Sequence, residues 1–208
     1  MTDQGPGRPG AGLGPIPTLG APIWVVAGAP GAGKSTVAEL LVARLTPAPA
    51  LLDKDTLFAG LVTEVTQAHG RAPGEREGDW YDQHVKRHEY AGLTDAARQI
   101  RAGGCPVLLV APFTAQIRDP TLWRSWVHTL GGEPVRLVWV RSDRQTLLAR
   151  LRARNSERDD GKLAAFEAFV GRMRPDTPPP VPHLALDNRI GADPVDQQLE
   201  RLLIGSGS

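Results

Sequence analysis

The sequence has little cysteine, little lysine and no long apolar run. Its 208 residues include a single cysteine, Cys105, so an internal disulfide framework is excluded and a reducing, cytoplasmic setting is expected. No apolar stretch approaches the roughly eighteen residues that a membrane-spanning helix needs, so no membrane partner is expected. The net charge is only +1, from 24 basic and 23 acidic residues, and this balance argues against a nucleic-acid partner.

Both ends of the chain are poor in residues that build a core. Residues 1–22 are dominated by glycine and proline and lack the apolar core of a signal peptide, so a disordered tail is expected there. Residues 205–208, Gly-Ser-Gly-Ser, are expected to fray. Residues 23–204 are long enough for one domain with its own core, and we expect a monomer or a homodimer.

What the chain does contain is a glycine-rich loop, GAPGAGKS, at residues 28–35, followed by Thr36. The loop fits the pattern G-x-x-x-x-G-K-[ST] in full. The apolar run Ile23 to Ala27 precedes it and predicts a buried strand, and apolar residues at helical spacing follow it. Only four lysines occur in the chain, against twenty arginines, so a lysine at this place is itself informative.

Each part of this loop suits the binding of a nucleoside triphosphate. Glycines let backbone N–H groups turn inward around a phosphate, and the first turn of the helix adds unpaired N–H groups. Lys34 would reach the β- and γ-phosphates, and the Ser35 hydroxyl would complete a Mg²⁺ shell, so ATP and Mg²⁺ are expected. The predicted nucleotide-binding residues of the loop are Gly28, Ala29, Pro30, Gly31, Ala32, Gly33, Lys34, Ser35 and Thr36.

Strands and helices alternate along the rest of the chain. Further apolar runs predict strands at residues 48–52, 106–110, 135–140 and 183–187. This alternation predicts a three-layer α/β fold, with a five-stranded parallel sheet and helices on both faces. Ser142 with Gln145 predicts a capping box for the helix that leads into an arginine-rich lid at about residues 150–162.

Two aspartates follow the second predicted strand. In an extended chain Asp53 and Asp55 point to the same side, at the sheet edge where ligands of parallel α/β folds bind. Asp55 is predicted to orient an acceptor hydroxyl and take its proton, and Asp53 to hold Mg²⁺ or share the role of base. The alternative is an Asx turn that opens the next helix.

The arginines between residues 150 and 158 predict a lid that brings positive charge to the phosphate site when it closes. In a helix Arg150 and Arg154 share a face, while Arg152 points away. Guanidinium groups on such a lid would stabilise charge on a transferring phosphoryl group, which makes Arg154 and Arg158 candidate catalytic residues. The alternative is a solvated helix face without a role in the reaction.

The phosphate loop after a strand, Asp-x-Asp after the next strand and the arginine-rich stretch before the last strand resemble the small P-loop kinases. Gluconate, shikimate and adenylylsulfate kinases, chloramphenicol phosphotransferases and AAA-type ATP-binding kinases are of this kind. The resemblance covers about residues 23–203 and implies the P-loop kinase fold, with ATP and Mg²⁺. It implies that Arg154 or Arg150 matches a lid position that packs on adenine, that Asn188 lies in the loop that contacts adenine and that Arg118 binds substrate.

One departure bears on the metal. Many P-loop enzymes have an aspartate after the third strand as a metal partner, and Ala111 stands there instead, so Mg²⁺ would depend on Ser35 and Asp53. The sequence thus predicts an ATP- and Mg²⁺-dependent kinase that transfers the γ-phosphate to a hydroxyl of a small metabolite, sugar acid or antibiotic. A polynucleotide 5′-hydroxyl kinase and a non-catalytic nucleotide-binding switch are the alternatives.

Overall fold

The fold is known from a computed structural model that describes residues 20–72 and 76–205. Apart from residues 20–22 and Gly205, the predicted tails at 1–22 and 205–208 lie outside these ranges. No helix within the described ranges has both the length and the apolar character needed to cross a membrane.

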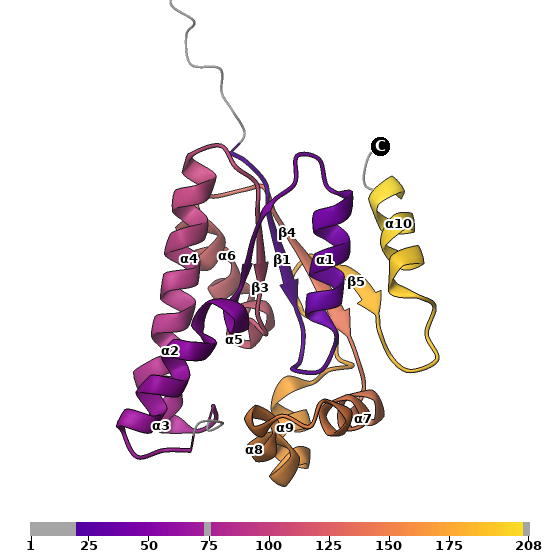
Figure 1. Cartoon of the computed structure of the whole chain (residues 1–208). Helices are drawn as coiled ribbons and strands as arrows, with labels where there is room; N and C mark the ends of the chain where they lie inside the picture. Colours follow the sequence, from indigo (N-terminus) through magenta and orange to yellow (C-terminus); the bar gives the residue numbers. More distant parts are fainter. Residues whose placement is uncertain (1–19, 73–75, 206–208) are drawn as a thin grey trace, which may run out of the picture.

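The centre of the domain is a five-stranded parallel sheet with the strand order β2-β3-β1-β4-β5 (Figure 1). The strands are β1 (Ile23–Ala27), β2 (Ala50–Asp53), β3 (Val107–Val110), β4 (Val135–Arg141) and β5 (Leu184–Asp187). All five predicted strands are confirmed, with ends that differ from the predicted ones by at most two residues. Because every strand runs the same way, their carboxyl ends meet at one edge, the lower edge in Figure 1.

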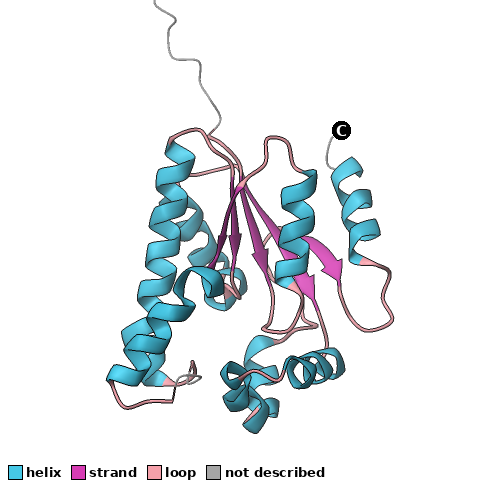
Figure 2. Cartoon of the chain, in the orientation of Figure 1, coloured by secondary structure: helices cyan, strands magenta, loops and turns pink. Residues whose placement is uncertain are grey.

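Helices cover both faces of the sheet, as predicted (Figure 2). One face is covered by α4 (Arg87–Ala102), α5 (Thr114–Arg118) and α6 (Pro120–Thr129), and the other by α1 (Lys34–Arg44) and α10 (Val195–Gly205). Below the carboxyl edge lie α7 (Arg144–Arg154), η2 (Glu157–Asp159), α8 (Asp160–Ala164) and α9 (Phe166–Met173). An arm beside them contains α2 (Lys54–Ala68), α3 (Asp79–Tyr81) and η1 (Asp82–Lys86), which leads into α4.

The alternation of side chains along β1 divides the core into two layers. Ile23, Val25 and Ala27 pack with α4, α5 and α6, whereas Trp24 and Val26 pack with α1, α7, α9 and α10. Successive side chains of a strand point to opposite faces, so a strand that is apolar at every position must be covered on both sides. The phosphate loop therefore begins at the end of the central strand of the sheet, which is buried on both faces.

The predicted capping box at the start of α7 is wrong. The helix begins one residue later than expected, with Asp143 as its N-cap, whose Oδ1 accepts from the Thr146 N–H at 2.8 Å. A carboxylate at the N-cap also gains from the helix dipole, which a hydroxyl does not. Ser142 is buried, and its Oγ has no hydrogen-bond partner among the described residues.

Two glycine-to-alanine substitutions should have opposite effects on stability. Gly28 has a φ of 151°, and a Cβ there would lie 2.7 Å from the Val140 carbonyl oxygen of the neighbouring strand, so Gly28→Ala should lower the free energy of unfolding by about 2 kcal/mol. Gly60, within α2, has nothing within 4 Å of that position, and Gly60→Ala should raise it by about 0.5–1 kcal/mol. Urea denaturation of both variants measures the difference, and equal shifts would contradict the reading of Gly28.

Candidate active site

The phosphate loop runs from the end of β1 to the start of α1. Gly28, Gly31 and Gly33 all have positive φ, and Gly33 is the N-cap of α1 at a φ of 94°. The first N–H groups of α1 therefore face the loop without partners from the helix itself. Lys34, the first residue of the helix, folds back so that its Nζ donates to the Ala29 carbonyl at 3.2 Å. Burial lowers the pKa of Lys34 to about 8, although the negative charges of Asp55 and Asp53 act to raise it.

Arg150 and Asn188 hydrogen-bond to the backbone of the phosphate loop. Arg150 Nη1 and Asn188 Nδ2 both donate to the Ala32 carbonyl, at 3.1 and 2.7 Å, and Arg150 Nη2 donates to Asn188 Oδ1 at 3.2 Å. The two residues come from α7 and from the end of β5, so the loop is tied to both elements. Both residues contact the phosphate loop, and their predicted contact with adenine stays a prediction.

Asp53 has two functions at the end of β2. Its Oδ1 accepts from the backbone N–H groups of Asp55 and Thr56, at 2.8 and 3.3 Å, and so caps α2 as the Asx-turn alternative predicts. Its Oδ2 accepts from the Ser35 hydroxyl at 3.4 Å. A serine hydroxyl and a carboxylate oxygen at this spacing are hard oxygen donors of the kind that Mg²⁺ prefers, so the residues present fit the expected metal.

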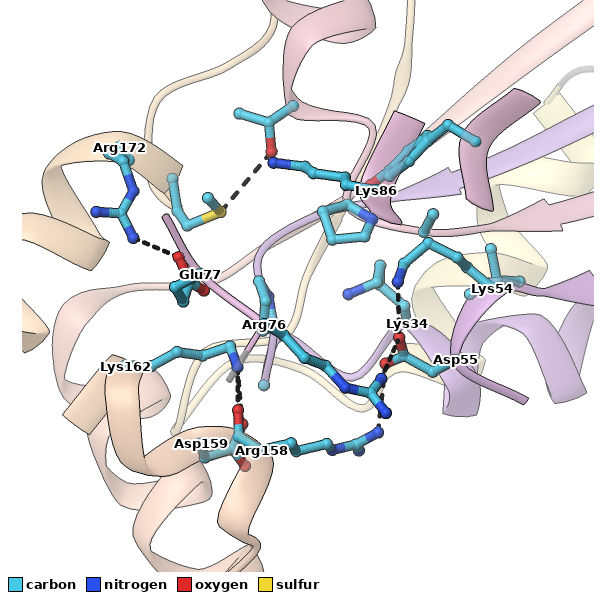
Figure 3. Close-up of a pocket in the computed structure, with 18 of the residues that line it drawn as sticks. Lys34, Lys54, Asp55, Arg76, Glu77, Lys86, Arg158, Asp159, Lys162 and Arg172 are labelled. Atoms are coloured by element: carbon cyan, nitrogen blue, oxygen red, sulfur yellow. Dashed lines mark hydrogen bonds and ion pairs between the residues drawn. The ribbon is translucent and has the colours of Figure 1, made fainter. Parts of the chain in front are cut away.

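Asp55 lies among positive charges (Figure 3). Lys54 Nζ lies 3.2 Å from its carboxylate, Arg158 Nη1 lies 3.3 Å away and Arg76 Nη1 lies 3.8 Å away. Burial alone would raise the pKa of Asp55, but the charges of Lys54, Lys34 and Arg158 outweigh burial and hold the pKa below its ordinary value. Asp55 is therefore ionised at neutral pH and half exposed to the cavity.

Behind Asp55 lies a buried network that the sequence did not reveal. Lys54 Nζ donates to Glu89 Oε1 at 2.9 Å, and the Tyr81 hydroxyl donates to Glu89 Oε2 at 2.5 Å. Lys54, Glu89 and Tyr81 are exposed by 7, 3 and 5%. Burial and the charge of Glu89 raise the pKa of Tyr81, so its hydroxyl keeps its proton and stays a donor. The network fixes Lys54, which in turn contacts Asp55.

Residues 150–162, the predicted lid, lie below the sheet edge in the end of α7, η2 and part of α8, and their arginines have different partners. Arg154 makes two hydrogen bonds to Asp159, at 2.6 and 2.7 Å, whereas Arg158 reaches across the cavity to Asp55. Lys162 also faces Asp159, at 3.4 Å, and burial lowers the pKa of Lys162. Of the two arginines predicted to be catalytic, Arg158 contacts the predicted base and Arg154 anchors the lid; their roles in a reaction stay predictions.

The lid should lose its anchor when the carboxylate of Asp159 is removed. Asp159 is fully buried, so Asp159→Ala leaves Arg154 and Lys162 facing one another without a counter-charge. Because Arg154 is about one-third exposed, we expect a loss of about 2 kcal/mol in the free energy of unfolding, below the range for a fully buried pair. Asp160→Ala, at an exposed neighbour, is the matched control in urea denaturation, and a similar loss there would contradict the anchor.

Arg118 extends from the end of α5 to the segment after α9. Its amino groups donate to the carbonyls of Thr177, Arg174 and Met173, at 2.6, 2.7 and 3.3 Å. These contacts tie the end of the lid region to the carboxyl edge of the sheet. Arg118 also lines the cavity, so its predicted contact with substrate remains open to test.

One cavity of about 1470 Å³ at the carboxyl edge is lined by most of the predicted site residues, among them Lys34, Asp55 and Arg158. A single small-molecule site is ordinarily about 300–1,000 Å³, so this cavity has room for a nucleotide and a second ligand. The phosphate loop lines one part of it, and residues 76–90 and 168–174 line another. Ala111, which follows β3 where many P-loop enzymes have an aspartate, also lines the cavity.

A comparison with protein families assigns the chain. The model of a family described as AAA domain matches residues 23–175, which hold the phosphate loop, both aspartates and the lid. The chain belongs to this AAA domain family. A comparison of this AAA domain protein with curated proteins finds no match.

Solved structures share the fold of this AAA domain protein. A protein from Chloroflexus aurantiacus described as a kinase superimposes with a TM-score of 0.60 at 19% identity, over 91% of this chain and 99% of that one. A sugar kinase from Janibacter sp. HTCC2649 gives 0.58 at 15% identity, over 88 and 93%. The Mycobacterium tuberculosis APS kinase, solved in complex with AMPPNP and APS, gives 0.50 at 21% identity, over 92 and 100%. The fold is therefore that of the P-loop kinases.

Proposed function

We propose that the protein is an ATP- and Mg²⁺-dependent kinase that transfers the γ-phosphate of ATP to a hydroxyl of a small molecule. The observation that carries the proposal is that one cavity is lined both by the phosphate loop and by an ionised carboxylate, Asp55, which lies among cations. The fold shared with kinases supports the same class of reaction. A purely nucleotide-binding module has no need of the second half of this cavity.

The loop binds the phosphates of ATP in this proposal. Its backbone N–H groups and the first turn of α1 contact the phosphate oxygens, and Lys34 neutralises the charge at the far end. Ser35 and Asp53 would hold Mg²⁺, which would neutralise phosphate charge when bound. Arg150 and Asn188 stabilise the loop through their hydrogen bonds to the Ala32 carbonyl.

Asp55 acts on the acceptor. The acceptor oxygen forms a bond to the γ-phosphorus, the bond from that phosphorus to the β–γ bridging oxygen breaks, and the hydroxyl proton passes to the Asp55 carboxylate. Because the pKa of Asp55 lies below its ordinary value, the carboxylate is a weak base, and its main contribution is to orient the hydroxyl. Positioning and charge neutralisation supply most of the catalysis in phosphoryl transfer, which does not need a strong base.

The test measures ADP release from Mg·ATP, preceded by calorimetry of Mg·ATP binding. The panel contains small hydroxyl compounds and an oligonucleotide with a free 5′-hydroxyl. Stimulation of ADP release by a small compound supports the proposal. Stimulation by the oligonucleotide alone would assign a polynucleotide kinase, and binding of Mg·ATP without release by any acceptor would favour a switch.

A further inference from the structure

We call the part of the cavity lined by residues 76–90 and 168–174 the acceptor half. Its described cations differ in how closely a carboxylate approaches them. Lys86 pairs with Asp82 at 2.9 Å, and Arg172 pairs with Glu77 at 2.7 Å. Arg76 differs from these cations, because its nearest carboxylate among the described residues is Asp55, at 3.8 Å. That distance is beyond hydrogen-bonding range.

The guanidinium of Arg76 has donors without acceptors. Its side chain is only 12% exposed, and its Nε and Nη1 are buried without a hydrogen-bond partner among the described residues. Its Nη2 donates to the Ala59 carbonyl at 3.4 Å, a long contact. Buried N–H groups of a cation that lack acceptors are costly, and such groups in a folded protein indicate a ligand or ion that completes them.

The carboxylate nearest to Arg76 is already shared. Lys54 and Arg158 both lie closer to Asp55 than Arg76 does, at 3.2 and 3.3 Å. Glu89, the other acid behind the site, accepts from Lys54 and from the Tyr81 hydroxyl. Within residues 20–72 and 76–205, Arg76 therefore has no carboxylate at hydrogen-bonding distance, and it is also the residue with the unpaired donors.

The side chain of Arg76 points toward Asp55. The next residue, Glu77, pairs with Arg172 of α9, and Figure 3 shows the Arg76 side chain extending from this segment toward Asp55, beside Arg158. Arg118, a second buried arginine of the cavity, has one open Nε, but its amino groups are already bound to three carbonyls. Arg76 is the better placed of the two to receive a ligand next to the predicted base.

We infer that Arg76 binds an anionic oxygen group of the acceptor, such as a carboxylate, a sulfate or a phosphate ester, while Asp55 orients a hydroxyl of the same molecule. The inference rests on the proposed kinase function and narrows its substrate to a small anionic compound with a hydroxyl near the charge. The short distance between Arg76 and Asp55 requires that the two groups of the acceptor lie within a few bonds of one another. The anionic group of the acceptor would accept from the Nε and Nη1 of Arg76, which have no partner among the described residues.

A binding experiment tests the site without knowledge of the acceptor. Sulfate is titrated at constant ionic strength into protein saturated with Mg·AMPPNP, which occupies the phosphate loop. At a tenfold excess over its dissociation constant, sulfate should raise the unfolding temperature of the wild type by about 3–5 °C. Arg76→Gln should abolish this shift, Arg76→Lys should retain part of it, and Arg124→Gln, at an exposed arginine outside the cavity, should retain all of it.

A turnover experiment then tests the acceptor. ADP release is compared for pairs that differ in charge, glycerate with glycerol and gluconate with glucose, and for glycerol 3-phosphate. At least one anionic compound should exceed its neutral counterpart by about 30-fold in kcat/KM, and Arg76→Gln should remove that preference while the Kd of Mg·AMPPNP stays within about twofold. Equal or greater activity with the neutral compounds would overturn the inference and leave the kinase proposal intact.

The remaining outcomes are also decisive. If no compound of the panel is phosphorylated, or if Arg76→Gln does not fold, the inference is tested by comparing sulfate binding between the wild type and Arg76→Lys. An absence of sulfate binding in the wild type, or unchanged binding in Arg76→Gln, overturns the inference. A weaker affinity of Arg76→Gln for Mg·AMPPNP would assign Arg76 to the nucleotide instead, and a wild type that binds no nucleotide would overturn the proposed function with it.

Discussion

Replacing Lys34 with alanine is expected to lower kcat/KM for phosphoryl transfer by at least about 100-fold. Lys34 is the one side-chain cation within the glycine loop, and it already lies folded over that loop, with its Nζ 3.2 Å from the Ala29 carbonyl. In the proposed reaction it stabilises the negative charge of the β- and γ-phosphate oxygens, including the charge that develops on the leaving oxygen as its bond to phosphorus breaks. Steady-state kinetics of ADP release measure the loss, and calorimetry measures how much of it comes from nucleotide binding.

Arg44→Ala is the control for this substitution. Arg44 is an exposed residue in the last turn of the same helix, and its guanidinium contacts only the Leu40 carbonyl among the described residues. Its removal should leave kcat/KM within about twofold. If Lys34→Ala retains the wild-type rate while its unfolding temperature is unchanged, the nucleotide is bound elsewhere and the proposed function fails.

Asp55→Asn is expected to lower kcat by at least about 100-fold, with the Kd of Mg·ATP unchanged or lower. The amide keeps the size of the side chain but cannot take the hydroxyl proton, and it orients the hydroxyl less strongly than a charged carboxylate. Nucleotide affinity should not fall, because removing a negative charge near Lys34 leaves the loop more positive. Single-turnover measurements with saturating Mg·ATP separate this loss in the chemical step from changes in product release.

Asp95→Asn provides the comparison for Asp55. Asp95 is an exposed aspartate of α4 that pairs with Arg98 at 3.8 Å, away from the cavity. Its substitution should not change the rate. A wild-type kcat in Asp55→Asn would show that Asp55 has no role in the chemical step. Asp53, whose Oδ2 faces Ser35, would then be the candidate base.

The sequence predicted the sheet and the phosphate loop because both are encoded by neighbouring residues. An apolar run such as residues 107–110 must be buried on both faces, and this requirement alone identifies a central strand of a parallel sheet. The loop is identified by its glycines and Lys34 within eight residues. The start of α7 was assigned to the wrong residue, since Ser142 and Asp143 are both acceptable caps and only the fold decides between them.

The acceptor half could not be predicted because its contacts join distant residues without a local pattern. Arg158 and Asp55 are 103 residues apart, and Lys54 and Glu89 are 35 apart. Nothing in the segment around Arg76 distinguishes that arginine from the other nineteen. A lysine between two aspartates reads as a surface charge, whereas in the structure Lys54 is buried against Glu89.

The order of the strands also has a consequence for how such an enzyme can diverge. Val110 of β3 pairs with Val26 of β1 on one side and with Asp53 of β2 on the other, so the two strands that supply the loop and the carboxylates are two strand spacings apart, about 9.5 Å. Backbone hydrogen bonds set this separation, independently of any side chain. Residues of α2 beyond Asp55, and those of α3 and η1, can therefore change to accept a new substrate while the separation of β1 and β2 stays the same.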